Sequence, residues 1–330
     1  MTAAKDDRPA IITLMGATAC GKTEVALALH EHLSIEIVSV DATQVYRQLN
    51  IGSAKPAADV LSAIPHWLID IADPSDPYSV AKFIGDARRA IQTILDRGKT
   101  PLLVGGSMMY FRALLEGLSD LPDAEEAIRA RLQRTIADQG VDHLYQQLQR
   151  VDPRTAARLH PRQSQRIQRA LEVFELTGRP LSELQERVSR PGLQQHYQIC
   201  QLALWPNDRA LLHRRIEERF GAMLRNGLCN EVEALYRRGD LHANLPALRA
   251  VGYRQIWRFL DGHGDLKEAR ERSIIATRQL AKRQLTWLRR WPGVQYICID
   301  ECGQLIDVKK ITQLCLKSLL KHPMLAHVDV

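Results

Sequence analysis

The chain carries a phosphate-binding loop motif at residues 16–23, Gly16-Ala17-Thr18-Ala19-Cys20-Gly21-Lys22-Thr23. An apolar run precedes the motif and a helical pattern follows it, which is the context that this motif requires. Backbone N–H groups of such a loop surround an anion, and the helix start adds partial positive charge. Lys22 would reach the outer phosphate, and the Thr23 hydroxyl would bind Mg²⁺. The motif predicts a polyphosphate site without identifying the polyphosphate.

Apolar runs and helical patterns alternate on both sides of this loop. Buried strands are predicted at residues 11–15, 35–40, 67–71, 101–104, 197–204 and 294–299. Helices are predicted at residues 22–33, 79–97, 209–225 and 267–290, and from residue 308 onward, with a loop at residues 246–254. Strands that alternate with helices form a parallel sheet. We therefore predict an α/β fold of the P-loop NTPase type, with helices flanking the sheet.

The pattern changes between residues 119 and 196. Strand patterns are absent there, and helical segments follow one another at residues 123–139, 143–149, 153–159 and 164–176. This stretch predicts an all-helical insertion domain at residues 119–196. The α/β core would then consist of residues 1–118 and 197–330.

The composition of the chain limits which partners and which cellular compartment we expect for the protein. Lys and Arg number 45 against 38 Asp and Glu, which gives a net charge of +7 and a pI of about 9.2. This excess fits either a polyanionic partner or simply a basic protein. The six cysteines form no C-x-x-C pair, which argues against structural zinc and a disulfide framework. Because no apolar run approaches the length of a membrane span, we expect a cytoplasmic protein with no membrane partner.

Two further strand ends carry polar or glycine residues. The predicted strand 35–40 ends at Asp41, and the strand 101–104 ends in Gly105-Gly106-Ser107. Ligands of open parallel sheets bind beyond the carboxyl ends of the strands. Asp41 is therefore expected where the phosphate loop also opens.

Taken together, the motifs resemble those of the bacterial tRNA dimethylallyltransferases, also called tRNA isopentenyltransferases. Besides the phosphate loop, the matching stretches follow in order at residues 39–46, 51–56, 103–107, 165–173, 249–255 and 278–289. The chain departs from the usual family residues at Ala17, Cys20, Ala42, Ser53 and Ser107. Ser53 and Ser107 stand where Thr is usual and keep a hydroxyl, so no group that the chemistry needs is lost.

The resemblance implies transfer of a dimethylallyl group from dimethylallyl diphosphate to N6 of the adenosine at tRNA position 37. The phosphate loop, Lys22 and Mg²⁺ at Thr23 would stabilise the departing diphosphate. Arg219 is a further diphosphate contact or, alternatively, a solvated helix arginine. Asp41 is the implied general base, with Mg²⁺ ligation or helix capping as alternatives. Ser107 would line the channel between amine and diphosphate, and it could equally cap a helix.

The resemblance also implies where an anticodon stem-loop would bind. The flipped adenine would be received at Asp41, Ala42, Thr43 and Gln44, where Gln44 would read neighbouring base edges. Further contacts are implied at Ser107, Arg129, Gln165, Arg166, Ile167, Gln168, Arg169, Arg249, Ala250, Val251, Gly252, Tyr253, Arg254, Lys282, Arg283, Gln284, Leu285, Thr286, Trp287, Leu288 and Arg289. Any single Arg or Lys among them is equally well explained as a surface charge. We expect Trp257 and Trp287 to be core residues and the protein to be a monomer.

Three other functions are compatible with part of this pattern. A nucleoside or small-molecule kinase shares the sheet and loop, but it would need an adenine pocket and a pair of lid arginines. An adenylate isopentenyltransferase would not need the helical insertion or the basic helix. A non-catalytic RNA-binding ATPase would leave Asp41 without a role.

Overall fold

The computed structural model describes residues 8–119, 121–123, 125–186 and 188–320. The chain divides into two compact units. The core unit comprises residues 1–113 and 194–330, and the insertion unit comprises residues 114–193. The predicted boundaries, 118/119 and 196/197, fall within a few residues of these.

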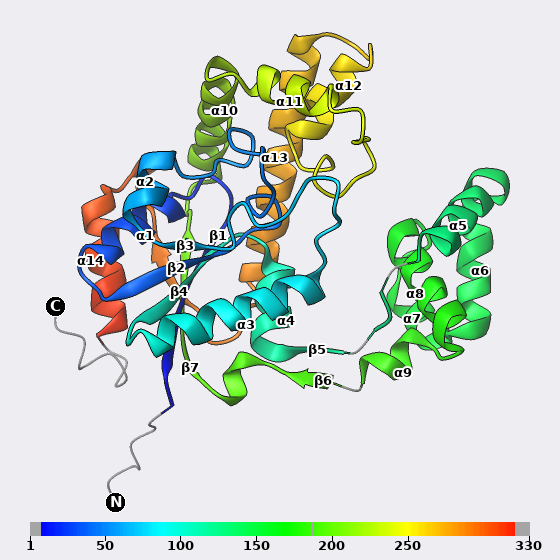
Figure 1. Ribbon diagram of the computed structural model, residues 1–330, viewed down its shortest axis with the longest axis horizontal. Coiled ribbons are helices and arrows are strands. Elements are labelled where there is room, and N and C mark those ends of the chain that lie inside the picture. The colour runs from blue at the N-terminus through cyan, green and yellow to red at the C-terminus, as the bar shows by residue number, and fades with distance from the viewer. Residues whose placement is uncertain (1–7, 120, 124, 187, 321–330) are drawn as a thin grey trace, which may run out of the picture. The chain divides into compact units, whose positions relative to one another are not determined.

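The core unit is built on a parallel sheet that has six strands in the described part of the chain, in the order β3-β2-β4-β1-β7-β8 (Figure 1). The strands are β1 (Ala10–Gly16), β2 (Ile35–Val40), β3 (His66–Trp67), β4 (Thr100–Gly105), β7 (Gln198–Trp205) and β8 (Gln295–Cys298). Every pairing between them is parallel. The predicted P-loop-type α/β fold is thereby confirmed.

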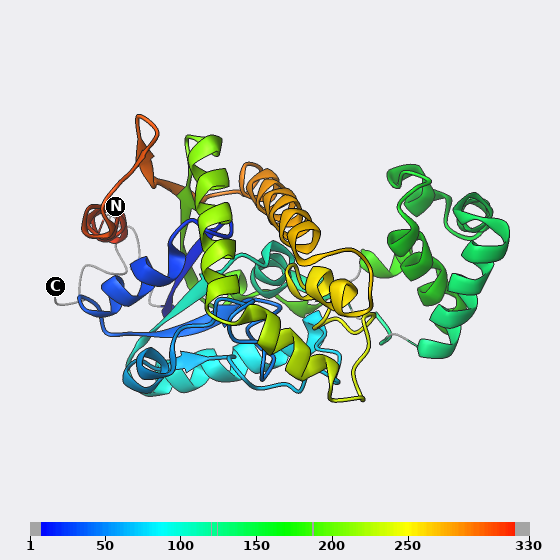
Figure 2. The ribbon, with the colours of Figure 1, turned by 90° about the horizontal axis from the view of Figure 1, so that it is seen from above.

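Helices surround this sheet, and several of them begin at a side-chain cap. They are α1 (Lys22–His30), α2 (Ala58–Ala63), α3 (Val80–Asp96), α4 (Met108–Glu116), α10 (Arg209–Arg225), α11 (Leu228–Tyr236), α12 (Tyr253–Leu260), α13 (Leu266–Leu288) and α14 (Val308–Leu319). Ser79, Asp208, Asp265 and Asp307 each accept a hydrogen bond from a first-turn N–H of the helix that follows. Helices α10 and α13 pack against each other, as Figure 2 also shows.

Apolar side chains of the strands form the centre of the hydrophobic core of this unit. Ile12 and Leu14 of β1 are buried in one cluster with Val25 and Leu29 of α1. Their neighbours along β1, including Ile11, are also fully buried. Burial of consecutive strand residues is typical of parallel sheets, which are covered on both faces. This burial fixes the strand register and therefore the positions of the strand ends.

The insertion unit has a hydrophobic core of its own. Its helices are α5 (Glu126–Gln139), α6 (Val141–Val151), α7 (Pro153–Arg158), α8 (Ser164–Thr177) and α9 (Leu181–Gln185). Leu132, Leu144, Leu148 and Leu171 form a buried cluster between these helices. The buried Asp152 caps α7, because its side chain accepts hydrogen bonds from both the N–H and the hydroxyl of Thr155.

Several predicted elements differ from the structure. The predicted strand 67–71 ends at Trp67, because Leu68 and Asp70 adopt φ angles of +65° and +57°, outside the strand region. The insertion unit is not wholly helical, since β5 (Gly117–Ser119) pairs antiparallel with β6 (Val188–Pro191). Other elements were not predicted, among them the helices α2, α9, α11 and α12 and the small antiparallel pair β9 (Asp300–Glu301) and β10 (Gln304–Leu305).

Candidate active site

Three strand ends lie level at one edge of the sheet. The register pairs Met15 of β1 with Gly105 of β4, and Gly105 with Val40 of β2. The phosphate loop, Asp41 and Gly106 therefore leave the sheet side by side. A cavity of about 730 Å³ opens at this edge, lined by residues from all three strand ends and from α10 and α13.

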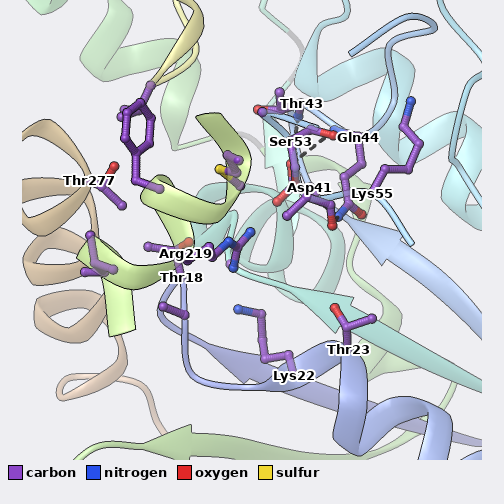
Figure 3. Close-up of a pocket in the computed structure, with 18 of the residues that line it drawn as sticks. Thr18, Lys22, Thr23, Asp41, Thr43, Gln44, Ser53, Lys55, Arg219 and Thr277 are labelled. Carbon is purple, nitrogen blue, oxygen red and sulfur yellow. Dashed lines mark hydrogen bonds between the residues drawn. The ribbon is translucent and has the colours of Figure 1, made fainter. Parts of the chain in front are cut away.

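The phosphate loop is shaped to present backbone N–H groups to an anion. Ala19 and Gly21 take φ angles of +65° and +86°, which bend the chain around the loop. Helix α1 begins at Lys22 with no side-chain cap at Gly21, so its first N–H groups remain available to a ligand. Thr18, Lys22 and Thr23 all line the cavity (Figure 3).

Lys22 supplies a cation at the base of the cavity. Its Nζ donates a 2.8 Å hydrogen bond to the Ala17 carbonyl oxygen within the same loop. Burial lowers the pKa of Lys22, and the nearby Arg219 charge lowers it further, while Asp41 opposes both effects. Burial also raises the pKa of the loop thiol Cys20 to about 11, so Cys20 is a neutral packing residue.

Asp41 faces this loop from the end of β2. Its Oδ1 accepts hydrogen bonds from the N–H groups of Thr43 at 2.8 Å and Gln44 at 3.2 Å. The carboxylate thus caps the turn after β2, and no helix begins at this turn. Its other oxygen, Oδ2, has no hydrogen-bond partner among the described residues. One carboxylate oxygen therefore fixes the group and leaves the second for a ligand.

Arg219 reaches the same cavity from α10. Figure 3 shows its side chain directed into the space that Lys22 and Asp41 also face. Burial lowers the pKa of Arg219, and the charges of Asp41 and Glu24 partly oppose that shift. Arg219 is half-buried and lines the cavity. It places a second cation opposite the phosphate loop.

Ser107 and Gln44 hold the loops around Asp41. The Ser107 hydroxyl accepts a 3.1 Å hydrogen bond from the Ala42 N–H, which ties the end of β4 to the Asp41 turn. The Gln44 side chain accepts from the Ser39 hydroxyl at 2.9 Å and donates to the Ala54 carbonyl at 3.2 Å. Both ends of the Gln44 amide are thus already bonded within the protein.

Two side chains on distant helices lock the phosphate loop, and the sequence did not reveal them in this role. The Gln284 side chain of α13 accepts from the Thr18 N–H at 2.8 Å and donates to the Gly106 carbonyl at 2.9 Å. A Cβ atom at Gly106 would lie 2.5 Å from the Gln284 amide nitrogen, so glycine makes this contact possible. Arg215 of α10 donates from Nε to the Ala19 carbonyl at 2.7 Å.

A further residue that the sequence did not reveal, Glu231 of α11, holds the loop at residues 50–52, which forms another wall of the cavity. Its carboxylate accepts from the N–H groups of Asn50, Ile51 and Gly52 at 3.0, 2.7 and 3.1 Å. The Tyr253 hydroxyl donates to the same carboxylate at 2.6 Å. A Cβ atom at Gly52 would lie 2.5 Å from the Tyr253 ring, so the loop lies directly on that ring.

The implied RNA-contact stretches contain both exposed and buried side chains. In the α13 stretch, Lys282, Arg283, Thr286 and Arg289 are exposed, whereas Leu285 and Leu288 are buried, as helical periodicity requires. In the loop stretch, Arg249 and Arg254 are exposed. Ala250 and Val251 line the cavity at the strand ends, while Gly252 and Tyr253 are buried, and Tyr253 already belongs to α12.

In the insertion unit, two of the implied contact residues are ion-paired. Arg129 and Arg169 both bind the carboxylate of Glu172, at 2.9 and 2.8 Å, and the Glu172 side chain is only 1% exposed. Ile167 is fully buried in the core of this unit. Gln165 and Arg166 are the exposed residues of that stretch, and Gln168 is half-buried.

The two tryptophans expected in the core differ. Trp257 is 5% exposed, which confirms that prediction. Trp287 is 37% exposed, so the prediction for it is wrong. Trp287 lies on the outer side of α13, with the Arg112 guanidinium 5.9 Å from its ring centre.

The residues present fit Mg²⁺ only if the ligand supplies most of the coordination. No group of three or more His, Cys, Asp or Glu side chains that could hold a metal occurs among the described residues. The Thr23 hydroxyl has no hydrogen-bond partner in the same described part of the chain and lines the cavity. Mg²⁺ is commonly held by few protein groups together with substrate phosphates and water.

Comparison with known proteins identifies the family. The family model described as IPP transferase matches residues 44–291, most of the chain. The chain belongs to the IPP transferase family. The model described as isopentenyl transferase also matches residues 9–76, which contain the phosphate loop and Asp41. The predicted resemblance and the predicted prenyltransferase class are confirmed.

Curated relatives and solved structures of the family are similar to this chain over most of its length. The tRNA dimethylallyltransferase of Thiobacillus denitrificans is 54% identical over 86% of this chain and 90% of its own length. That of Coxiella burnetii is 49% identical over 92% and 97%, respectively. The tRNA isopentenylpyrophosphate transferase of Bacillus halodurans superposes with a TM-score of 0.67 at 33% identity, covering 97% of this chain and 99% of that one.

A eukaryotic dimethylallyltransferase acting on tRNA shares the fold, with a TM-score of 0.78 at 23% identity. That match covers 96% of this chain and 80% of the other. Across the described residues, none of the helices has the length and apolar character needed to span a membrane.

Proposed function

We propose that this protein transfers a dimethylallyl group from dimethylallyl diphosphate to N6 of the adenosine at position 37 of a tRNA. The observation that carries the proposal is the arrangement of Asp41 and the phosphate loop at one edge of the sheet, facing one cavity. The relatives' names indicate tRNA and a prenyl group as the substrates. The kinase alternative has no comparable support, because the matched family is one of prenyltransferases.

The phosphate loop would bind the diphosphate of the prenyl donor. The N–H groups at the start of α1, together with Lys22 and Arg219, would offset the negative charge that grows on the diphosphate as the carbon–oxygen bond breaks. Mg²⁺, held at the Thr23 hydroxyl, would supply further positive charge to the phosphate oxygens when bound. These contacts become stronger as charge develops, so they accelerate the reaction rather than only binding substrate.

Asp41 would act on the adenine amine. The N6 lone pair is delocalised into the ring, so the amine is a weak nucleophile. A carboxylate that accepts its N–H hydrogen bond orients the amine and takes the proton as the new carbon–nitrogen bond forms. The oxygen Oδ2 suits this role, because Oδ1 is held by the N–H groups of Thr43 and Gln44. The balanced result is prenylated adenosine, diphosphate and a proton on Asp41.

The tRNA would be held by exposed basic side chains on both units. Those of the core unit are Arg249, Arg254, Lys282, Arg283 and Arg289, and the insertion unit adds Arg166. Phosphate contacts of this kind position the RNA without reading its sequence. The adenine would leave its stack to enter the cavity, as in other enzymes that act on a base.

The test is to incubate the protein with dimethylallyl diphosphate, Mg²⁺ and an unmodified anticodon stem-loop, and to weigh the RNA. We expect one dimethylallyl adduct on the adenosine at position 37, located by fragmentation of the product. A matched stem-loop with guanosine at that position is the control and should gain no mass. An unchanged mass for the adenosine stem-loop, at a protein concentration above that of the RNA, would contradict the proposal.

A further inference from the structure

A second groove, of about 440 Å³, lies between α12 and α13. It shares no lining residue with the cavity at the strand ends. The proposed reaction takes place in the other cavity, and of the residues that line this groove only Arg254, Gln255 and Gln279 belong to the family motifs. Its described lining residues are Arg254, Gln255, Arg258, His263, Glu268, Ala269, Arg272, Ile275, Ala276 and Gln279.

The charge of this groove is one-sided. Arg254 and Arg258 are exposed and stand one turn apart on α12, so their side chains share a face of that helix. Neither has an ion-pair or hydrogen-bond partner for its guanidinium among the described residues. Arg272 lines the groove from α13 and is paired with Glu268 at 2.5 Å. Three guanidinium groups thus meet a single carboxylate, which already has its own partner.

The shape and lining select the kind of ligand. Guanidinium groups bind phosphate oxygens through paired hydrogen bonds, which makes phosphate the best match for unpaired arginines. The ten described lining residues include no Phe, Tyr or Trp on which an RNA base could stack. The groove therefore suits the sugar-phosphate backbone rather than an unstacked base.

The two helices connect this groove to the implied RNA-contact stretches. Arg254 is the last residue of the loop stretch 249–254, and Gln279 lies one turn before Lys282 on α13. We propose that the groove binds backbone phosphates of the same tRNA, away from the nucleotide that enters the cavity. This inference rests on the proposed function and adds Arg258 and Arg272 to the RNA surface.

The experiment compares Arg258→Glu with Lys267→Glu in the full-length protein. Lys267 is a matched control, because it is exposed on α13, has no partner among the described residues and does not line the groove. The dissociation constant for an unmodified tRNA transcript is measured by filter binding at several KCl concentrations. Single-turnover prenyl transfer is measured at saturating tRNA.

We expect Arg258→Glu to weaken tRNA binding by about tenfold and to reduce the log–log salt slope by about one, the loss of roughly one phosphate contact. Lys267→Glu should weaken binding much less, and Arg258→Lys should retain most of the affinity. The rate at saturating tRNA should stay at the wild-type value, because the groove is separate from the cavity. Melting temperatures of all variants should match, and Arg258→Gln replaces Arg258→Glu if the latter unfolds.

Equal losses for Arg258→Glu and Lys267→Glu would overturn the proposal, because the effect would then be one of net charge. An unchanged affinity in Arg258→Glu or Arg258→Gln would overturn it as well. If the wild-type protein prenylates tRNA while these variants bind tRNA normally, the groove assignment alone fails. If the wild-type protein neither binds nor prenylates tRNA, the proposed function fails and the groove assignment falls with it.

Discussion

Lys22 is a half-buried cation that the fold keeps next to two other charged side chains. Its Nζ has a protein acceptor, the Ala17 carbonyl, and an incoming diphosphate would compete for it. The charge of Arg219 lowers the pKa of Lys22, whereas the charge of Asp41 raises it. A bound dianion would remove the repulsion between the two cations, which favours donor binding at this position.

Replacement of Lys22 by Ala should therefore affect the prenyl donor and spare the RNA. We expect kcat/KM for dimethylallyl diphosphate to fall by about a hundredfold or more, the scale for loss of a preorganised charge contact. The dissociation constant for tRNA should stay within about twofold, because Lys22 lines the cavity and is not one of the exposed side chains proposed to contact the RNA. Steady-state kinetics and filter binding measure the two. Unchanged donor kinetics would remove Lys22 from the diphosphate site.

Gln284 is a positioning residue, because it acts on the ligand through the phosphate loop. In Gln284→Ala the half-buried Thr18 N–H and the Gly106 carbonyl lose their partners, at a cost of up to about 1–3 kcal/mol for each group left unpaired. We expect KM for dimethylallyl diphosphate to rise about tenfold or more, while tRNA affinity changes little. Isothermal titration with diphosphate checks the binding part. The neighbouring Thr286→Ala, at an exposed site, is the matched control.

At the scale of elements, the sequence predicted the strand ends but not the helices that brace them. The strands 11–15, 35–40 and 101–104 could be predicted because buried parallel strands are apolar throughout. The phosphate loop could be predicted because its sequence motif is associated with one backbone conformation. The roles of Arg215 and Gln284 could not be predicted, because each bonds to the loop across 196 and 266 residues of chain. Nothing in the local pattern around either residue marks its partner.

Local pattern also failed where the backbone is irregular. The run 67–71 is apolar enough for a strand, yet Leu68 and Asp70 take positive φ angles. Those residues instead bring the Asp70 N–H to the Gln44 carbonyl and the Ile71 N–H to the Val45 carbonyl. The short ribbon of β5 and β6 was missed because it pairs one segment before the predicted helices at residues 123–176 with another segment after them.

Helix α11 acts on the active site through Glu231. In Glu231→Gln, the amide NH₂ cannot accept, so some of the N–H groups of residues 50–52 lose their acceptor. We expect a loss of about 1–3 kcal/mol in stability, together with faster hydrogen exchange at residues 50–55. Glu233→Gln on the same helix is the control, because Glu233 pairs only with an exposed arginine, Arg237. Exchange at residues 50–55 that matches the wild type would show that Glu231 does not hold this loop.

At the scale of the whole molecule, the net charge of +7 has a clear physical consequence for RNA binding. If exposed arginines and lysines of both units contact phosphates, binding releases counterions and weakens with salt. We expect the logarithm of the tRNA association constant to fall linearly with the logarithm of KCl concentration, with a slope of about −4 or steeper. Filter binding over a range of KCl concentrations measures it. A slope near zero would exclude these side chains as the docking surface.

The account as a whole depends on Asp41 facing the phosphate loop across one cavity. The most direct test is the single-turnover rate of prenyl transfer in Asp41→Asn, with saturating tRNA and dimethylallyl diphosphate. Asn can keep the Oδ1 hydrogen bonds to Thr43 and Gln44 but cannot take a proton from the amine. We predict a rate at least about a hundredfold below wild type, with tRNA and donor affinities unchanged. A wild-type rate in Asp41→Asn would contradict the central claim.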